Sequence, residues 1–106
     1  MKPSRDFQPQ LVNYLKSPKS AAGYLTAAYE DGDREVFLAA LRNVVEAHGG
    51  ITKLARLSKL NREHLYTVLS KQGNPEIYTL GTILQALGFR LAILTESPKH
   101  KLRRAA

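Results

Sequence analysis

Helix start and stop signals divide residues 17–88 into segments that are too short for any long helix. Ser17 precedes Pro18 and Asp33 precedes an apolar stripe, while Gly32 and Gly88 each follow an apolar helical segment. Serine and aspartate favour the N-cap, proline favours the first helical position, and glycine favours the residue just past the last one. The signals therefore predict an all-α domain of five helices, over residues 17–32, 33–49, 52–58, 61–70 and 77–88.

Apolar residues recur at helical spacing within these segments, which indicates that each helix buries one face. Two stripes are the clearest, and their members are Val36, Phe37, Ala40, Leu41, Val44 and Val45, then Ile77, Leu80, Ile83, Leu84 and Leu87. Residues 1–16 also carry apolar side chains, but Pro3 and Pro9 oppose a long helix. We expect an N-terminal extension over residues 1–16, one domain over residues 17–94, and a basic tail over residues 95–106.

The apolar period changes from 3.6 to 2 directly after the fifth segment, which predicts a short C-terminal β-strand. The strand residues are Phe89, Arg90, Leu91, Ala92 and Ile93. A lone strand leaves its backbone N–H and C=O groups unpaired. The simplest remedy is pairing with the same strand of a second copy in a homodimer. An extended segment that packs on the helices is the alternative.

The positive charge of the chain is unevenly placed. The net charge is +7, yet residues 1–50 hold six Lys/Arg and six Asp/Glu, so residues 51–106, with ten and three, carry the whole excess. A one-sided basic excess favours a polyanionic partner, usually nucleic acid. A solvated, soluble surface is the alternative.

Several functional classes lack support in the sequence. The 106 residues include no cysteine, and no apolar run approaches the roughly 20 residues that span a bilayer, so we expect a cytoplasmic protein without membrane association. His48, His64 and His100 fall at no metal-ligand spacing. No phosphate-binding loop, nucleophile elbow or catalytic carboxylate pair appears. We therefore expect no catalytic residues, no metal site, no cofactor and no enzymatic activity.

Residues 51–70 read ITKLARLSKLNREHLYTVLS and predict two short helices joined by three or four residues. Thr52 and Asn61 are the expected N-caps of the two helices. Ala55 is small where the second helix must cross closely, and Leu65 and Val68 form the inner face of that helix, with Leu60 in the turn and Leu69 beside them. This pattern is typical of a helix-turn-helix.

In a helix-turn-helix, the N-terminal part of the second helix enters the major groove of DNA. Arg62 suits a guanine edge, and Asn61 suits adenine or a phosphate. Thr52 and Lys53 lie where the first helix begins, which suits a phosphate. The predicted DNA-binding residues are Thr52, Lys53, Asn61, Arg62, Glu63, Tyr66, Thr67 and Lys71. A helical hairpin with a purely structural role is the alternative.

The chain resembles a known family over roughly residues 10–94. The motifs GG-hydrophobe-[ST]-K-L-A, L-[SN]-R-E-x-L-Y, G-N-P and L-x-A-L-G, together with an upstream YL…AA…E-D-G-D pattern, are similar to those of the addiction-module antidote proteins. These are HigA-type antitoxins of the lambda-repressor-like (XRE) helix-turn-helix class. The chain departs from the family at Lys59, where glycine is usual, at Asn61, where serine is frequent, and in its basic tail. A non-glycine residue in the left-handed turn costs about 1 kcal/mol.

The resemblance implies a five-helix lambda-repressor-like fold and a homodimer. It also implies repression of the chain's own promoter through a double-stranded DNA operator, and neutralisation of a RelE-type ribonuclease toxin encoded nearby. Toxins of this kind are usually basic, so the acidic residues Glu30, Asp31, Asp33 and Glu35 are a candidate toxin contact. Ordinary helix capping explains acidic residues at these positions equally well.

Three other functions fit parts of the pattern. A solitary or phage-type transcriptional repressor needs the same DNA-binding helices but no toxin, and the adjacent gene discriminates between the two. A protein-interaction module predicts no salt-dependent binding to duplex DNA. An RNA-binding protein needs aromatic stacking platforms, for which Tyr66 and Tyr78 are the candidates.

Overall fold

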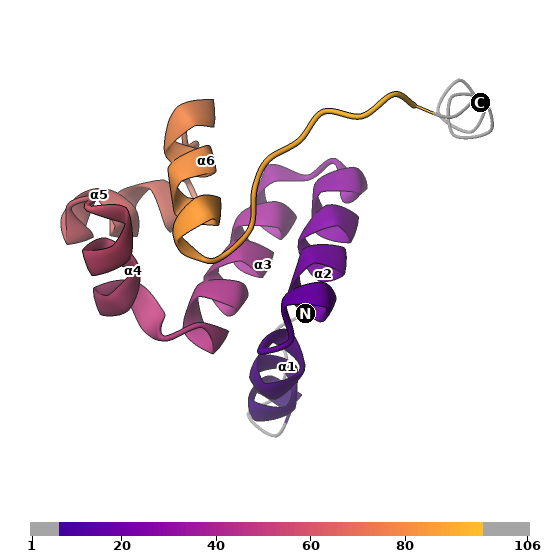
Figure 1. Ribbon diagram of the computed structural model, residues 1–106, viewed down its shortest axis with the longest axis horizontal. Coiled ribbons are helices and arrows are strands. Elements are labelled where there is room, and N and C mark those ends of the chain that lie inside the picture. Colours follow the sequence, from indigo (N-terminus) through magenta and orange to yellow (C-terminus); the bar gives the residue numbers. More distant parts are fainter. Residues whose placement is uncertain (1–6, 97–106) are drawn as a thin grey trace.

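The computed structural model describes residues 7–96, which form six helices and no strand (Figure 1). The helices are α1 (Phe7–Leu15), α2 (Pro18–Asp31), α3 (Arg34–Ala47), α4 (Gly50–Ser58), α5 (Arg62–Leu69) and α6 (Ile77–Ala86). The predicted all-α class is therefore confirmed over this range. None of the six helices combines the length and apolar character that crossing a membrane requires.

The predicted caps define α2 and the start of α3. The Ser17 hydroxyl oxygen accepts the Ser20 N–H at 3.3 Å, and α2 begins directly afterwards at Pro18. Gly32 ends α2 in the left-handed conformation, with φ at 89°. The Asp33 carboxylate accepts the Glu35 N–H at 2.9 Å and so starts α3. Local sequence was sufficient here because each cap acts within three residues.

Helix α3 is the centre of the fold and packs against α1, α2, α4 and α5. Leu38, Leu41 and Val45 share its buried face. Val36 was predicted to be a core position, which is wrong: its side chain is exposed. The reason is helical geometry, because Val36 and Leu38 are two positions apart and their side chains therefore point about 200° apart around the axis. The other predicted α3 positions are buried or half-buried: Phe37, Ala40, Leu41, Val44 and Val45.

Helix α1 is the element that the sequence patterns did not predict, so the helix count over residues 7–96 is six rather than five. Pro9 is tolerated because it lies in the first turn, where no intrahelical N–H bond is lost. Leu15 is fully buried, and its carbonyl oxygen lies 2.9 Å from Nε2 of His48 at the end of α3. The Gln8 side chain donates to Asn43 and to Glu46 of the same helix. Contacts far away in sequence therefore hold α1 in place.

The predicted C-terminal strand over Phe89–Ile93 is not formed by the single chain. The Phe89 N–H donates to the Leu84 carbonyl at 2.8 Å, and the Phe89 ring is half-buried against His48. Residues 90–96 are exposed and run away from the helices (Figure 1). A strand requires a second extended segment to pair with, and residues 7–89 supply none. Of the three apolar residues in the predicted strand, Phe89 packs against the core, whereas Leu91 and Ile93 are exposed.

Candidate nucleic-acid interface

Three residues, Lys59, Leu60 and Asn61, connect α4 to α5. Lys59 adopts the left-handed conformation, with φ at 62°, and its N–H donates to the Ala55 carbonyl at 2.9 Å. Within residues 7–96 it is the one non-glycine residue with positive φ. The expectation of a left-handed lysine at this turn is therefore confirmed. Leu60 is half-buried, and its N–H donates to the Ser58 hydroxyl oxygen.

Asn61 is the N-cap of α5, as predicted. Its Oδ1 atom accepts the Glu63 N–H at 2.7 Å and the His64 N–H at 3.3 Å. The oxygen of the side chain therefore satisfies the first turn of α5, and the exposed Nδ2 group remains as a donor toward another molecule. This geometry favours a contact with an acceptor, such as a phosphate oxygen, over a bidentate contact with adenine.

The inner face of the α4–α5 pair matches the prediction. Leu54 of α4 and Leu65, Val68 and Leu69 of α5 are buried, and Ala55 is half-buried. Because α5 has only eight residues, its own helix propensity contributes little stability. Burial of these side chains is what holds α5 in one orientation.

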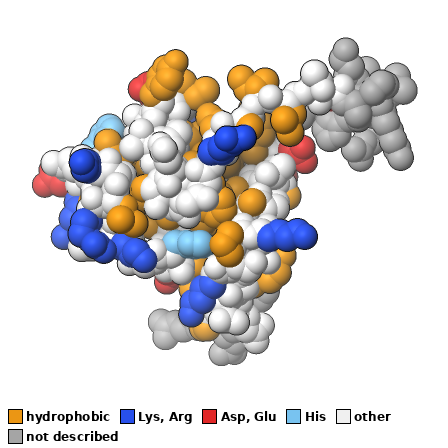
Figure 2. All heavy atoms as spheres, viewed as in Figure 1, with side chains coloured by type: hydrophobic (Ala, Val, Ile, Leu, Met, Phe, Trp, Pro, Cys, Tyr) orange, Lys and Arg blue, Asp and Glu red, His pale blue; other side chains and the backbone are white. Residues whose placement is uncertain are grey.

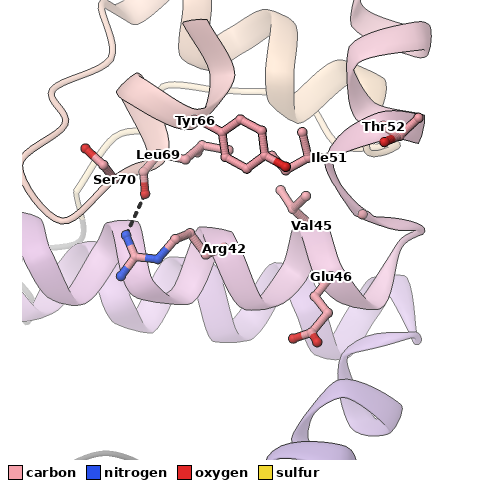
Figure 3. Close-up of a pocket in the computed structure, with 9 residues that line it drawn as sticks. Arg42, Val45, Glu46, Ile51, Thr52, Tyr66, Leu69 and Ser70 are labelled. Carbon is pink, nitrogen blue, oxygen red and sulfur yellow. Dashed lines mark hydrogen bonds between the residues drawn. The ribbon is translucent and has the colours of Figure 1, made fainter. Parts of the chain in front are cut away.

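Arg42 of α3 holds the C-terminal end of α5. Its Nη1 atom donates to the Leu69 carbonyl (Figure 3). A cation at this end of a helix also opposes the negative end of the helix dipole. No sequence pattern predicted this role of Arg42. The sequence feature that could have indicated it is a cation in the middle of an apolar helical stripe, directly after Leu41, which is buried.

The chain turns tightly behind α5 at Gly73. A Cβ atom placed on Gly73 would lie 2.2 Å from the Val68 carbonyl oxygen, so the backbone there leaves no room for a side chain. The predicted interruption between the helices over residues 61–70 and 77–88 is confirmed, because α5 ends at Leu69 and α6 begins at Ile77. Both ends of α5 are thus held by specific contacts.

The outer surface of the α4–α5 pair is strongly cationic, as Figure 2 shows on the left of the molecule. This surface carries four exposed cations and a single carboxylate, that of Glu63. The cations are Lys53, Arg56, Lys59 and Arg62. Arg62 is the first residue of α5. In the part of the chain that the structure describes, these four side chains make no hydrogen bond or ion pair. Their charges are available to a polyanion.

The predicted DNA-binding residues fall into two groups. Asn61, Arg62 and Glu63 lie together at the N-terminal end of α5. Thr52 and Tyr66 instead line a hollow of about 510 Å³ between α3, α4 and α5 (Figure 3). Three residues stand outside both groups. Lys53 is exposed in the first turn of α4, the Thr67 hydroxyl donates to the Glu63 carbonyl at 3.0 Å, and Lys71 is exposed beyond the end of α5.

The prediction that Thr52 caps α4 is wrong. The N-cap is Gly49, with φ at 113°, and α4 already begins at Gly50. Two consecutive glycines with positive φ let the chain reverse direction and enter the helix at once, which places Thr52 inside the first turn. No side chain caps α4, so its first N–H groups are open to an external acceptor.

The remaining residues to consider are the possible metal ligands and the acidic residues that were candidate toxin contacts. Among residues 7–96, no three His, Cys, Asp or Glu side chains are grouped so as to hold a metal ion. Asp33 of the acidic group acts as a helix cap, and Glu35 lies in the first turn of the same helix. Glu30 and Asp31 are exposed at the end of α2.

These features define a small all-α protein with a firmly held, cationic helix pair on its surface. The family model described as "Probable addiction module antidote protein" matches residues 6–95. The chain therefore belongs to this family of addiction-module antidote proteins, and an antidote implies a toxin partner. It is 28% identical to an uncharacterised protein of Haemophilus influenzae over 89 residues, which cover 84% of this chain and 89% of that protein. No solved structure matches the chain.

Proposed function

We propose that the chain is an antitoxin that also represses its own toxin–antitoxin promoter by binding operator DNA. Membership of the antidote family supports the first role. The observation that carries the second is the unpaired cationic surface around Arg62, at the exposed N-terminal end of a helix that is held at both ends. A lambda-repressor-like (XRE) helix-turn-helix, formed by α4 and α5, accounts for this arrangement.

In this proposal, the N-terminal end of α5 enters the major groove. The guanidinium of Arg62 donates two hydrogen bonds to O6 and N7 of a guanine, and the Glu63 carboxylate suits the N4 amino group of a neighbouring cytosine. Lys53 and the uncapped N–H groups of α4 contact phosphates, together with the Nδ2 group of Asn61. Lys59 adds a further phosphate contact from the turn.

A single α5 helix reads about three or four base pairs, which is too few to identify one operator in a genome. The proposal therefore requires two copies whose α5 helices lie about 34 Å apart. The operator is then an inverted repeat with half-site centres about 10 base pairs apart. Pairing of residues 89–93 across a twofold axis is one way to join the copies.

The toxin in this proposal is a RelE-type ribonuclease encoded beside the antitoxin gene. The acidic residues around the α2–α3 connection are a candidate contact for such a protein, which is usually basic. A solitary repressor lacks this partner. Co-expression with the product of the adjacent gene distinguishes the two: the antitoxin relieves growth arrest and co-purifies with the toxin, whereas a solitary repressor does neither.

DNA binding is tested by fluorescence anisotropy with a labelled fragment of the chain's own promoter and a scrambled duplex of equal length. We expect at least about 1,000-fold tighter binding to the promoter, with an affinity that falls steeply as salt increases. Insertion of five base pairs between the half-sites turns them to opposite faces of the duplex and is expected to abolish this preference. Equal binding to both duplexes at low salt would contradict the proposed repressor.

A further inference from the structure

The hollow between α3, α4 and α5 has largely apolar walls, although the surface of the α4–α5 pair beside it is cationic (Figure 3). Val45 and Leu69 are buried at its floor, and Ile51 is half-buried next to them. The Tyr66 ring extends from α5 toward Ile51 and Val45. The volume of about 510 Å³ lies within the range of about 300–1,000 Å³ that is typical of small-molecule sites. The hollow therefore has the size and the lining of a site for a small organic ligand.

Arg42 gives the hollow a half-buried positive charge that no carboxylate of residues 7–96 neutralises. One of its N–H groups donates to the Leu69 carbonyl. Glu46 lies one turn further along α3, but its carboxylate accepts a hydrogen bond from the Gln8 side chain and points away from Arg42 (Figure 3). A guanidinium has five N–H donors, and a partly buried cation is costly unless it is paired. The remaining donors of Arg42 are therefore suited to an anionic group from outside the chain.

Tyr66 is the second group at the hollow that lacks a partner. Its side chain is 55% exposed, and in the described part of the chain it makes no hydrogen bond and no contact with another ring. A tyrosine ring beside aliphatic side chains offers its face to a flat apolar group. The space between Tyr66 and the floor of the hollow therefore suits the apolar body of a ligand, with Arg42 at its edge.

We propose that the hollow binds a small organic carboxylate with a flat apolar body. The carboxylate accepts two parallel hydrogen bonds from free N–H groups of Arg42, which keeps its bond to the Leu69 carbonyl. The apolar body lies between the Tyr66 ring and Val45. Both parts of the ligand are needed, because an inorganic anion leaves the apolar walls in water and a neutral apolar molecule leaves Arg42 unpaired.

The position of the hollow gives the ligand a regulatory role, which rests on the proposed repressor function. Tyr66 lies one turn after Arg62 on the same face of α5, and Thr52 at the other side of the hollow directly precedes Lys53. A bound carboxylate adds a negative charge beside cations that contact DNA, and its body covers Tyr66. The ligand and the operator therefore oppose each other, and each weakens the binding of the other by the same factor. The ligand acts as an inducer that releases the promoter.

The site is tested first without DNA, by NMR titration of the ¹⁵N-labelled full chain with 3-phenylpropionate. This probe combines a ring with a carboxylate on a short chain. We expect saturable shifts of the amide signals of Ile51, Thr52 and Ser70, with a dissociation constant on the order of 1 mM, as is usual for so small a ligand. The matched control is 3-phenylpropionamide, which has the same shape but no charge. It is expected to bind at least about tenfold more weakly.

Two variants test the two halves of the site. Tyr66→Ala removes one wall and should weaken the acid at least about tenfold, whereas Tyr14→Ala, which removes a tyrosine of similar exposure (58%) from α1, should leave binding unchanged. Arg42→Met removes the charge. If Arg42 only positioned α5, its loss would weaken the acid and the amide alike. If Arg42 pairs with the carboxylate, the preference for the acid over the amide falls to about one. Circular dichroism checks that all three variants keep their helices.

Fluorescence anisotropy with the promoter fragment tests the regulatory role. Saturating 3-phenylpropionate is expected to weaken operator binding about tenfold, and the amide at equal concentration should not. Absence of saturable shifts around the hollow, equal binding of acid and amide, or an unchanged preference in Arg42→Met would overturn the site. An operator affinity that the bound acid leaves unaltered would overturn the inducer role. If the chain binds no operator at all, the repressor function fails, but the titrations without DNA still decide whether the site exists.

Discussion

The α4–α5 pair and the α6 region are both exposed, but their surfaces differ in chemistry and in how firmly they are held. The surface of α4–α5 is polar and cationic, and α5 is fixed by the Asn61 cap at one end and by Arg42 at the other. The α6 region is apolar, and the Phe89 N–H donates a backbone hydrogen bond that joins the segment after α6 to that helix.

This difference indicates two kinds of association. Cations in water act on a polyanion at a distance and lose strength as salt screens them. Apolar side chains stabilise a complex only when water is removed from both partners, and that contribution depends little on salt. A helix that is held at both ends suits the recognition of DNA bases, which tolerates little displacement, whereas an exposed segment outside the helices can adjust to its partner after contact.

Truncation of one aliphatic side chain in each of the two regions should show the largest contrast. Leu65→Ala empties a fully buried site and is expected to lower the free energy of unfolding by about 2–5 kcal/mol. Ile93→Ala removes an exposed side chain and should change the stability of the dilute chain by less than about 0.5 kcal/mol. Urea unfolding in dilute solution measures both. Similar losses for the two variants would show that the segment is part of the monomer core.

The hydrogen bond from Arg42 of α3 to the Leu69 carbonyl of α5 can be removed without changing the buried core of α5. Arg42→Met keeps most of the aliphatic stem but leaves the Leu69 carbonyl without its donor, which is expected to cost about 1.5–3 kcal/mol of folding stability. DNA affinity should fall even where the variant is fully folded, because α5 loses its fixed orientation. Arg42→Lys is the comparison that retains the charge and one donor. Unchanged stability and affinity in Arg42→Met would remove Arg42 from the site.

Two cations of the α4–α5 surface should differ in what they recognise. Arg62→Ala is expected to cost about 1–3 kcal/mol of operator binding and to leave binding to scrambled DNA almost unaffected. Lys53→Ala should weaken both duplexes alike, because a phosphate contact carries no sequence information. Lys19→Ala on the exposed surface of α2 is the control. Equal effects of Arg62→Ala and Lys53→Ala would refute the assignment of Arg62 to a base edge.

The smallest effects are expected at Lys59 in the turn, where the backbone conformation affects stability and the charge affects DNA binding. Lys59→Gly relieves a left-handed lysine and is expected to raise the free energy of unfolding by up to about 1 kcal/mol. It also removes one phosphate contact, so the slope of log affinity against log salt should shrink by about 1. Thermal unfolding and a salt titration of DNA binding measure the two changes. If the Lys59→Gly variant folds stably and the slope of log affinity against log salt is unchanged, Lys59 does not contact DNA.

Much of the fold follows from local patterns. Ser17, Gly32, Asp33 and Asn61 cap helices where the sequence predicts, and the inner faces of α4 and α5 were assigned correctly. The cationic surface was also predictable, because the lysines and arginines occupy the positions that the apolar stripe leaves outside. The failures at Val36 and Thr52 both lie in the first turn of a helix: Val36 is exposed there, and the N-cap of α4 is Gly49, three positions before Thr52.

The sequence by itself determined which segments form α2 to α6, because caps and periodicity act over three or four residues and need no distant partner. Only the tertiary structure decided that residues 7–15 form a helix, since α1 owes its place to α2 and α3, and that Arg42 reaches Leu69 across 27 positions of the chain. It also decided that residues 89–93 form no strand alone. An extended segment contains no hydrogen bonds of its own, so its structure depends on a partner that lies outside it.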